Sequence, residues 1–184
     1  MPVTTLDPTT ALVLIDLQKG IAGLPTAPHP AAEVIARGAR LAAAFRAREL
    51  PVVLVNVTGG APGRTETAPH GATPPADWAE LVPELDRQPA DITVTKQQWG
   101  AFHGTGLDLE LRRRGVTQIV LAGIATSIGV ESTARAAHEH GYHVTLATDA
   151  VTDLDEAAHR HSLEKIFPRL GETGTTEAIL ALLG

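Results

Sequence analysis

An acid, an amine and a glycine occupy positions in this chain where an active site could form. Asp16 and Lys96 each come directly after an apolar run, and Gly129 lies in a turn between an apolar run and a segment with helical periodicity. A carboxylate near an amine can act as a general acid or base. The free N–H groups of a turn that begins a helix favour a negatively charged group. Together these positions indicate a site for acid–base chemistry on a small molecule.

Each of these residues also has a structural role open to it. Asp16 could cap the N–H groups of the following loop, and Lys96 could be an ordinary surface lysine. Gly129 could serve tight packing against a sheet instead of the approach of a bound oxyanion. Trp99 and Phe102 follow Lys96 in a chain with only 3% aromatic residues, and they could form a pocket wall or belong to the core.

Apolar runs alternate along the chain with segments of helical periodicity. Strands are predicted at 11–15, 51–57, 92–95, 118–122 and 143–148, and helices at 30–50, 107–114, 126–140, 155–170 and 175–183. Continuous apolar strands separated by helices are typical of a parallel sheet covered on both faces. The sequence therefore predicts an α/β fold, a three-layer α/β/α sandwich, in a single domain spanning 1–184. Ligands of such sheets bind beyond the carboxyl ends of the strands, where the residues above are expected to meet.

The segment at about 58–90 interrupts this alternation. It is rich in glycine and proline and leaves the carboxyl end of the second predicted strand. A loop of this length inside a compact domain is usually a lid or a binding loop. We expect a lid over the site, in which Arg64 is a candidate to clamp a substrate carboxylate.

Composition excludes several classes of function. The net charge of −6 argues against a protein that binds nucleic acid or an anionic membrane. No apolar run approaches the length of a membrane span, and the start of the chain lacks a signal peptide, so a cytoplasmic location is expected. The chain has no cysteine, which excludes disulfides, thiolate metal sites and cysteine nucleophiles.

Three blocks, at 11–20, 95–105 and 123–135, resemble the isochorismatase-like hydrolase superfamily. The resemblance implies a six-stranded parallel sheet with an Asp–Lys–Cys site, whose positions correspond here to Asp16, Lys96 and Gly129. It also implies an oxyanion hole formed by the N–H groups of Ala125 and Gly129, and a cis peptide near Ile124–Ala125. Substrate contacts are expected from Gln18, Trp99, Phe102, Ile124 and Thr126.

The departure from this pattern is at Gly129, because most members have their nucleophilic cysteine there. Glycine supplies no nucleophile, and Ser127 and Ser132 point in other directions around a helix. True isochorismatases also resemble this pattern with glycine at that position. The resemblance implies that an aspartic acid protonates the vinyl carbon of an enol ether, after which water attacks the oxocarbenium ion.

Two functions remain open at this point. The first is a hydrolase in which Asp16 and Lys96 assist water attack on a small polar substrate. Isochorismatases have Tyr-Ala-His where this chain has Ala125, Thr126 and Ser127, so the substrate need not be isochorismate. The alternative is an inactive homologue that binds a metabolite or a protein partner.

No cofactor and no metal are expected. Nicotinamidase-type members bind a divalent ion through an Asp-x-His motif after the second strand, where this chain has Asn56, Val57 and Thr58. The pairs His138/His140 and His159/His161 are splayed across a helix by their spacing and are predicted to be solvated. The expected partners are a small-molecule substrate and, by resemblance, further copies of the chain in a homodimer or higher oligomer, with no nucleic acid or membrane.

Overall fold

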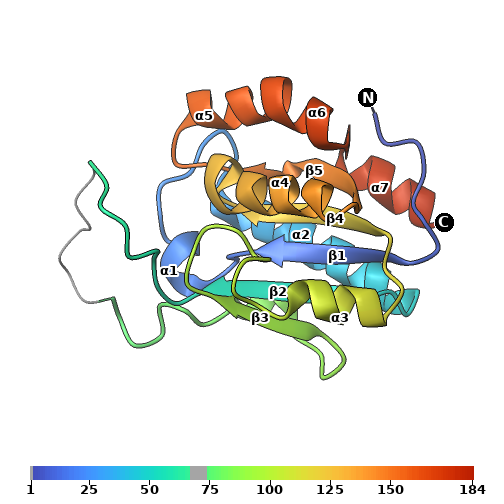
Figure 1. Cartoon of the computed structure of the whole chain (residues 1–184), viewed down its shortest axis with the longest axis horizontal. Helices are drawn as coiled ribbons and strands as arrows, with labels where there is room; N and C mark the ends of the chain where they lie inside the picture. Colours follow the sequence, from blue (N-terminus) through green and yellow to red (C-terminus); the bar gives the residue numbers. More distant parts are fainter. Residues whose placement is uncertain (1, 67–73) are drawn as a thin grey trace.

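A six-stranded parallel sheet forms the centre of the computed structural model, which describes residues 2–66 and 74–184 (Figure 1). The strand order is β3-β2-β1-β4-β5-β6. The bounds are β1 Thr10–Ile15, β2 Val52–Val57, β3 Ile92–Lys96, β4 Gln118–Ile124, β5 His143–Thr152 and β6 Glu172–Gly174. Every neighbouring pair is parallel, which confirms the predicted fold class.

Strand β1 lies in the middle of the sheet and every one of its residues is buried. Leu14 pairs with Leu54 on one side and with Ala122 on the other. Successive side chains of a strand point to opposite faces, so Val13 and Leu14 belong to two different hydrophobic clusters. This explains why the run shows no polar alternation. The chain crosses from β1 to β2 on one side and later to β4 on the other, which places the topological switch point at the end of β1.

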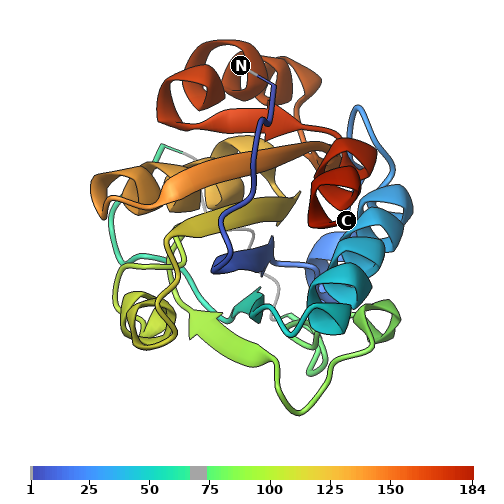
Figure 2. The ribbon, with the colours of Figure 1, turned by 90° about the vertical axis from the view of Figure 1, so that its right-hand side faces the viewer.

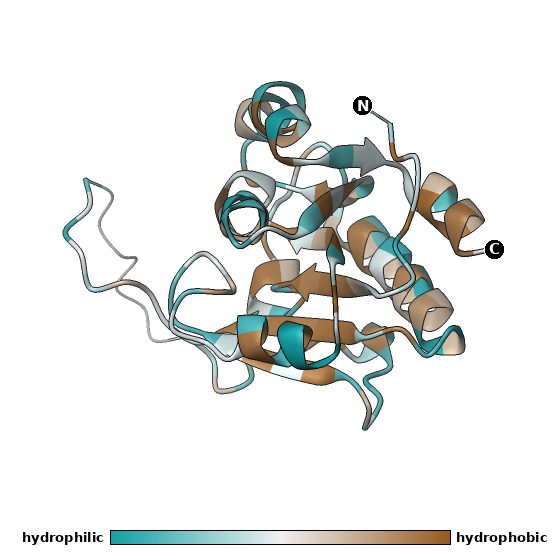
Figure 3. Ribbon diagram, turned by 45° about the vertical axis from the view of Figure 1, so that its right-hand side comes forward, coloured by the Kyte–Doolittle hydropathy of each residue, from teal (hydrophilic) through white to brown (hydrophobic). Residues whose placement is uncertain are grey.

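Helices cover both faces of the sheet, as Figure 2 shows in a view along it. One face carries α2 (Ala31–Ala47) and α7 (Thr176–Leu183), and the other carries α3 (Leu107–Arg113) and α4 (Glu131–Glu139). Phe45 of α2 lies in the apolar layer between the sheet and α2 and α7. Phe167, at the start of α6 (Phe167–Leu170), lies in the apolar layer on the opposite face, and both side chains are fully buried. The apolar colouring of Figure 3 is concentrated on the strands and on the inner sides of these helices. No helix in the described parts of the chain combines the length and apolar character needed to cross a bilayer.

Two predicted helices are divided in the structure. The segment predicted at 126–140 begins with a π-helical turn, η2 (Thr126–Val130), before α4. The segment predicted at 155–170 consists of α5 (Glu156–His161), a π-helical turn η3 (Ser162–Ile166) and α6. Pro168 lies in the first turn of α6. Because proline has no N–H to continue the helical ladder, the preceding turn widens.

The short strand β6 is absent from the residue pattern, although the resemblance implied six strands. Its three residues, Glu172–Gly174, are only partly buried and contain no apolar run. They pair with the middle of β5, from Thr145 to Ala147. This strand is defined by its pairing with β5, and the hydrophobic periodicity of the sequence therefore did not predict it.

The long segment at 58–90 has two different halves. Residues 58–66 are exposed and project from the carboxyl edge of the sheet (Figure 1). The second half packs on α1 (Lys19–Ala22): the N–H of Gly20 donates to the Trp78 carbonyl, and Val82 donates to the Leu17 carbonyl. A 3₁₀ turn, η1 (Pro83–Leu85), then leads to β3. The expected lid falls partly on 67–73, which lie outside the described residues.

Candidate active site at the carboxyl edge of the sheet

Asp16 and Lys96 form a buried ion pair. Asp16 directly follows β1, and Lys96 is the last residue of β3, so β2 lies between them. The long lysine side chain spans that strand: its Nζ lies 2.7 Å from Asp16 Oδ2 and 3.1 Å from the Gln98 carbonyl oxygen. The two residues are 6% and 2% exposed. The structure thus brings together two residues that are 80 positions apart in the sequence.

The Asp16 carboxyl has a raised pKa and one oxygen without a hydrogen-bond partner among the described residues. Burial raises its pKa to about 6, although the charge and the hydrogen bond of Lys96 act in the opposite direction. Its second oxygen, Oδ1, is buried and has no hydrogen-bond partner among the described residues. The backbone of Asp16 has φ 52, a left-handed conformation that few residues other than glycine adopt. The side chain therefore does not cap the following loop, which was the structural alternative.

Gly129 faces this ion pair from turn η2. A Cβ atom at this position would lie 3.2 Å from Asp16 Oδ2 and 2.9 Å from Ile15 Cγ2. A side chain on residue 129 would therefore stand directly beside the carboxylate. The peptide bond Ile124–Ala125, just before the turn, is cis, as the resemblance implied.

A cavity of about 200 Å³ opens above these residues. Its polar side chains are Asp16, Lys96 and Gln98, and the residues of the turn at its wall include Ile124, Ala125 and Gly129. The remaining large side chains are apolar: Ile21, Leu24, Val57, Trp99, Ile128 and Leu154. Trp99 is 64% exposed and so belongs to the rim and not to the core.

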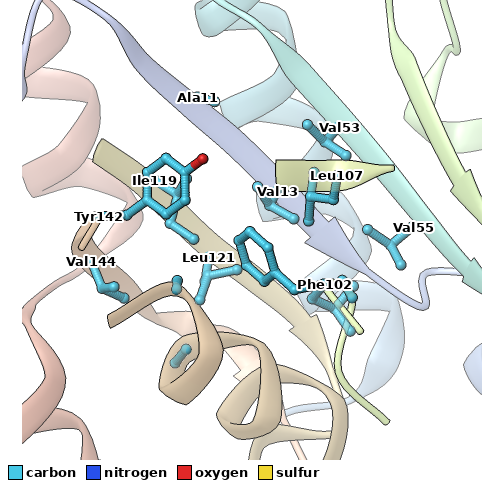
Figure 4. Packing of buried hydrophobic residues seen from close by; sticks show 14 of the residues in the cluster. Ala11, Val13, Val53, Val55, Phe102, Leu107, Ile119, Leu121, Tyr142 and Val144 are labelled. Atoms are coloured by element: carbon cyan, nitrogen blue, oxygen red, sulfur yellow. The ribbon is translucent and has the colours of Figure 1, made fainter. Parts of the chain in front are cut away.

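Three predicted substrate contacts lie outside this cavity. Gln18 is fully buried, and its amide bonds to the backbone of Val57 and Trp78. Phe102 belongs to the apolar cluster on the face of the sheet that α3 and α4 cover, and Figure 4 shows it among Val13, Val55 and Leu121. Thr126 is also fully buried, and its Oγ1 lies 2.8 Å from His159 Nδ1. All three are buried and are not among the residues that line the cavity, so their contact with a substrate stays a prediction.

Asp153 holds the turn η2 at the wall of the cavity, and the sequence did not predict this role. It follows β5, is 2% exposed, and accepts a hydrogen bond of 2.6 Å from the N–H of Ser127 in turn η2. Its other oxygen accepts from the N–H groups of Leu154 and Asp155. Its position after the fifth strand was the available signal, but β5 extends four residues beyond the predicted end at 148.

The prediction that the helical histidines are solvated is wrong for His159. This residue is 6% exposed and bonds to Thr126, and burial lowers the pKa of its imidazole, with a smaller contribution from His29. Asn56, at the place of the metal motif, donates to the Ala79 carbonyl and accepts from Thr95. Within residues 2–66 and 74–184, no three His, Cys, Asp or Glu side chains are grouped so that they could hold a metal ion.

Comparison with known proteins identifies the family. The isochorismatase domain matches residues 10–178. The chain is 48% identical over 178 residues to the uncharacterized isochorismatase family protein YwoC of Bacillus subtilis, covering 93% of this chain and 92% of that one. It is 34% identical over 211 residues to the ureidoacrylate amidohydrolase RutB of Methylobacterium radiotolerans, covering 97% and 81%. The solved structure of an isochorismatase family protein from Burkholderia thailandensis matches with a TM-score of 0.94 and 48% identity, over 97% of both chains. The chain belongs to the isochorismatase family of hydrolases.

Proposed function

We propose that this protein hydrolyses an acid-labile bond of a small molecule, such as an enol ether, by proton transfer from Asp16 and attack of water. The observation that carries the proposal is the state of the Asp16 carboxyl. One oxygen is held by Lys96, and the other is buried without a partner among the described residues, in a side chain that lines the cavity. With a pKa of about 6, roughly one tenth of the Asp16 carboxyl groups are protonated at pH 7, and the fraction rises as the pH falls.

The chemistry needs no nucleophilic side chain. The Asp16 carboxylic acid gives its proton to the terminal vinyl carbon, and the π electrons of the double bond form the new C–H bond. The adjacent carbon and the ether oxygen share the resulting positive charge. Water adds to that carbon and returns a proton to the Asp16 carboxylate, and the hemiketal or hemiacetal then collapses to a carbonyl compound and an alcohol.

The other residues of the site support these steps. The Lys96 ammonium holds Oδ2 and stabilises the carboxylate that forms when Asp16 gives up its proton. The N–H groups of Ala125 and Gly129 are proposed to bind the oxygen that leaves with the alcohol.

Residue types around the cavity favour this route over covalent catalysis. No described residue that lines it is a serine, threonine or cysteine. Ser127 lies outside the lining, and its N–H is engaged by Asp153. Gly129 leaves open the space beside the carboxylate where a thiol would stand. An acyl-enzyme therefore lacks its usual hydroxyl or thiol nucleophile in this part of the chain.

The Asp16→Asn variant tests the proposal, with phenyl vinyl ether as the probe and phenol release as the signal. The amide keeps the shape of the carboxyl and can still accept from Lys96, but it cannot give up a proton as an acid. We expect turnover to fall by roughly two to four orders of magnitude, the usual contribution of a general acid, with an unchanged circular dichroism spectrum.

The matched control is Asp149→Asn. Asp149 is an acidic residue within β5, but it bonds to Thr176 and contacts Arg37 away from the cavity. This variant should keep its turnover per folded molecule. Full activity of Asp16→Asn, or a wild-type protein that binds enol ethers and never hydrolyses them, would contradict the proposed function.

A further inference from the structure

We infer that the substrate joins its reacting bond to an uncharged apolar group, a single small ring or a short branched alkyl chain, that contacts Trp99, Leu24 and Leu154. This inference rests on the proposed function and adds the chemical class of the substrate. It follows from three features of the cavity: the placement of charge, the exposure of the rim and the volume.

Charge is confined to the floor of the cavity. Asp16 and Lys96 are the two charged side chains among the described residues that line it, and they pair with each other. The Lys96 side chain is only 1% exposed and also donates to the Gln98 carbonyl. No arginine or histidine of the described chain lines the walls or the rim. A carboxylate or phosphate on the far end of a substrate would therefore lose water without gaining a counter-ion.

Nearby cations do not fill this gap. Lys19 precedes the apolar residue Ile21, but its ammonium is engaged by Asp77 and Glu80. Arg64, the predicted carboxylate clamp, is exposed and does not line the cavity. The described side chains thus provide no cationic partner for a negative charge at the far end of the substrate.

Apolar side chains gather at the mouth instead. Five large hydrophobic residues are exposed in the described parts of the chain, and three of them, Trp99, Leu154 and Leu24, line this one cavity. They come from three separate segments, after β3, after β5 and after α1. Their exposed fractions are 64%, 49% and 39%. An apolar ligand seated here would remove this surface from water, which is the main favourable contribution that such a rim can offer.

The volume limits the size of the group. A cavity of roughly 150 Å³ lined by aliphatic side chains accommodates benzene. The cavity of about 200 Å³ here therefore has room for one ring with a short reactive substituent.

Two pairs of probes separate this inference from the proposed function. The first pair is phenyl vinyl ether and its para-carboxylate, which differ by a charged carboxylate group at the end remote from the reacting bond. The second pair is phenyl ethyl ether and its para-carboxylate, which have no vinyl group and report binding alone, measured by calorimetry. In both pairs we expect the neutral compound to be favoured by roughly tenfold or more, in kcat/KM and in affinity respectively.

A charge placed at the rim provides the variant test. Leu154→Lys should reduce the preference for the neutral compound or reverse it, because it supplies the missing counter-ion. The matched control is Leu109→Lys on α3, where the residue is similarly exposed at 53% but lies outside the cavity. That control should keep both the activity and the preference of the wild type.

The outcomes are distinct. Selective binding of the neutral ethyl ether without hydrolysis of either vinyl ether would support the substrate class and contradict the proposed function. Turnover in which the carboxylate is equal or better would contradict the substrate class and support the function. Absence of binding by the neutral ethyl ether would overturn the inference about the cavity, whatever the kinetics show.

Discussion

The Asp16 carboxyl is subject to two opposing effects, and their balance determines its chemistry. Removal from water raises its pKa, while the Lys96 ammonium at 2.7 Å lowers it; burial is the larger effect, and the pKa is about 6. The value in the folded protein exceeds the ordinary value of 3.8. This group therefore favours the folded state below pH 3.8, and that contribution is lost as the pH rises through about 6. At neutral pH the buried, ionised Asp16 therefore lowers the free energy of unfolding relative to its value at low pH. The same raised pKa keeps part of the carboxyl groups protonated and able to act as an acid.

Restoring a side chain at Gly129 tests whether the surrounding site is intact. In Gly129→Cys, the new Cβ would lie 3.2 Å from Asp16 Oδ2, and the Ile15 methyl group at 2.9 Å would have to move by a few tenths of an ångström. We expect the only thiol of the chain to become acylated by para-nitrophenyl acetate, giving a stoichiometric burst of nitrophenol.

The control for this experiment is Gly129→Ala, which adds the same Cβ without sulfur and should give no burst. Iodoacetamide labelling followed by mass spectrometry measures the accessibility of the new thiol. A folded Gly129→Cys protein whose thiol is inert to both reagents would show that residue 129 does not face a working site.

The sequence predicted which charged residues meet, but not their environment. Asp16 and Lys96 were recognisable because each follows an apolar strand at the same edge of a parallel sheet. The net direction of the Asp16 pKa was not predictable, because it depends on burial at a depth that only the packed structure defines. The internal hydrogen bonds of Gln18 and Thr126 were not predictable for a similar reason: whether a polar side chain near a site bonds to the backbone or to a buried neighbour depends on the packed structure.

Helix α1 depends on the loop that packs against it. The indole of Trp78 lies so close to Gly20 that a Cβ on residue 20 would come within 1.9 Å of it. Lys19 bonds to Asp77 and Glu80 on the same segment. Because α1 has only four residues, it is too short to be stable by itself, so these contacts maintain its position. Ile21, which lines the cavity, is held there through the loop.

The two tryptophans provide a matched test of this dependence. Trp78→Ala should lower the free energy of unfolding by about 1–3 kcal/mol and weaken ligand binding, because it removes the packing that positions α1. Trp99→Ala should change the free energy of unfolding by less than about 0.5 kcal/mol, because Trp99 is largely exposed. Urea denaturation of both variants measures the difference. Equal stability of the two variants would contradict the structural role assigned to Trp78.

Hydrophobic periodicity predicted the buried strands and the longer helices. It did not predict the short elements that are stabilised by contacts with neighbouring segments. The runs at 11–15 and 118–122 became β1 and β4 because their residues are buried on both faces. Strand β6 and helix α1 have no run of buried apolar residues, since each is short and is held in place by contacts with neighbouring segments. The π-helical turn η2 was also hidden, because one extra residue in a turn leaves the apolar spacing almost unchanged.

At the scale of the whole molecule, two apolar layers share one sheet. Phe45 anchors the layer under α2 and α7, and Phe167 anchors the layer under α4 and α6; both are fully buried. The residues of β1 alternate between the two layers, so neither layer can open without exposing the other side of the same strand. We therefore propose that the chain unfolds as a single domain.

Truncation of either phenylalanine tests this coupling. Phe45→Ala and Phe167→Ala should each lower the free energy of unfolding by about 3–5 kcal/mol, because each leaves a cavity in a packed layer. Tryptophan fluorescence and far-UV circular dichroism should report a single, coincident urea transition in both variants. Separate transitions in either variant would show that the two layers are independent units.

The dependence of kcat/KM on pH reports the protonation state in which Asp16 acts, and so distinguishes a general acid from a general base. With phenyl vinyl ether as substrate, a general acid whose pKa is about 6 predicts that kcat/KM is highest at low pH within the folded range and falls as the pH rises above about 6. In Asp16→Asn this decline should disappear together with most of the activity. A rate that instead rises through pH 6 and stays high in alkaline solution would show that the carboxylate acts as a base, and would contradict the mechanism.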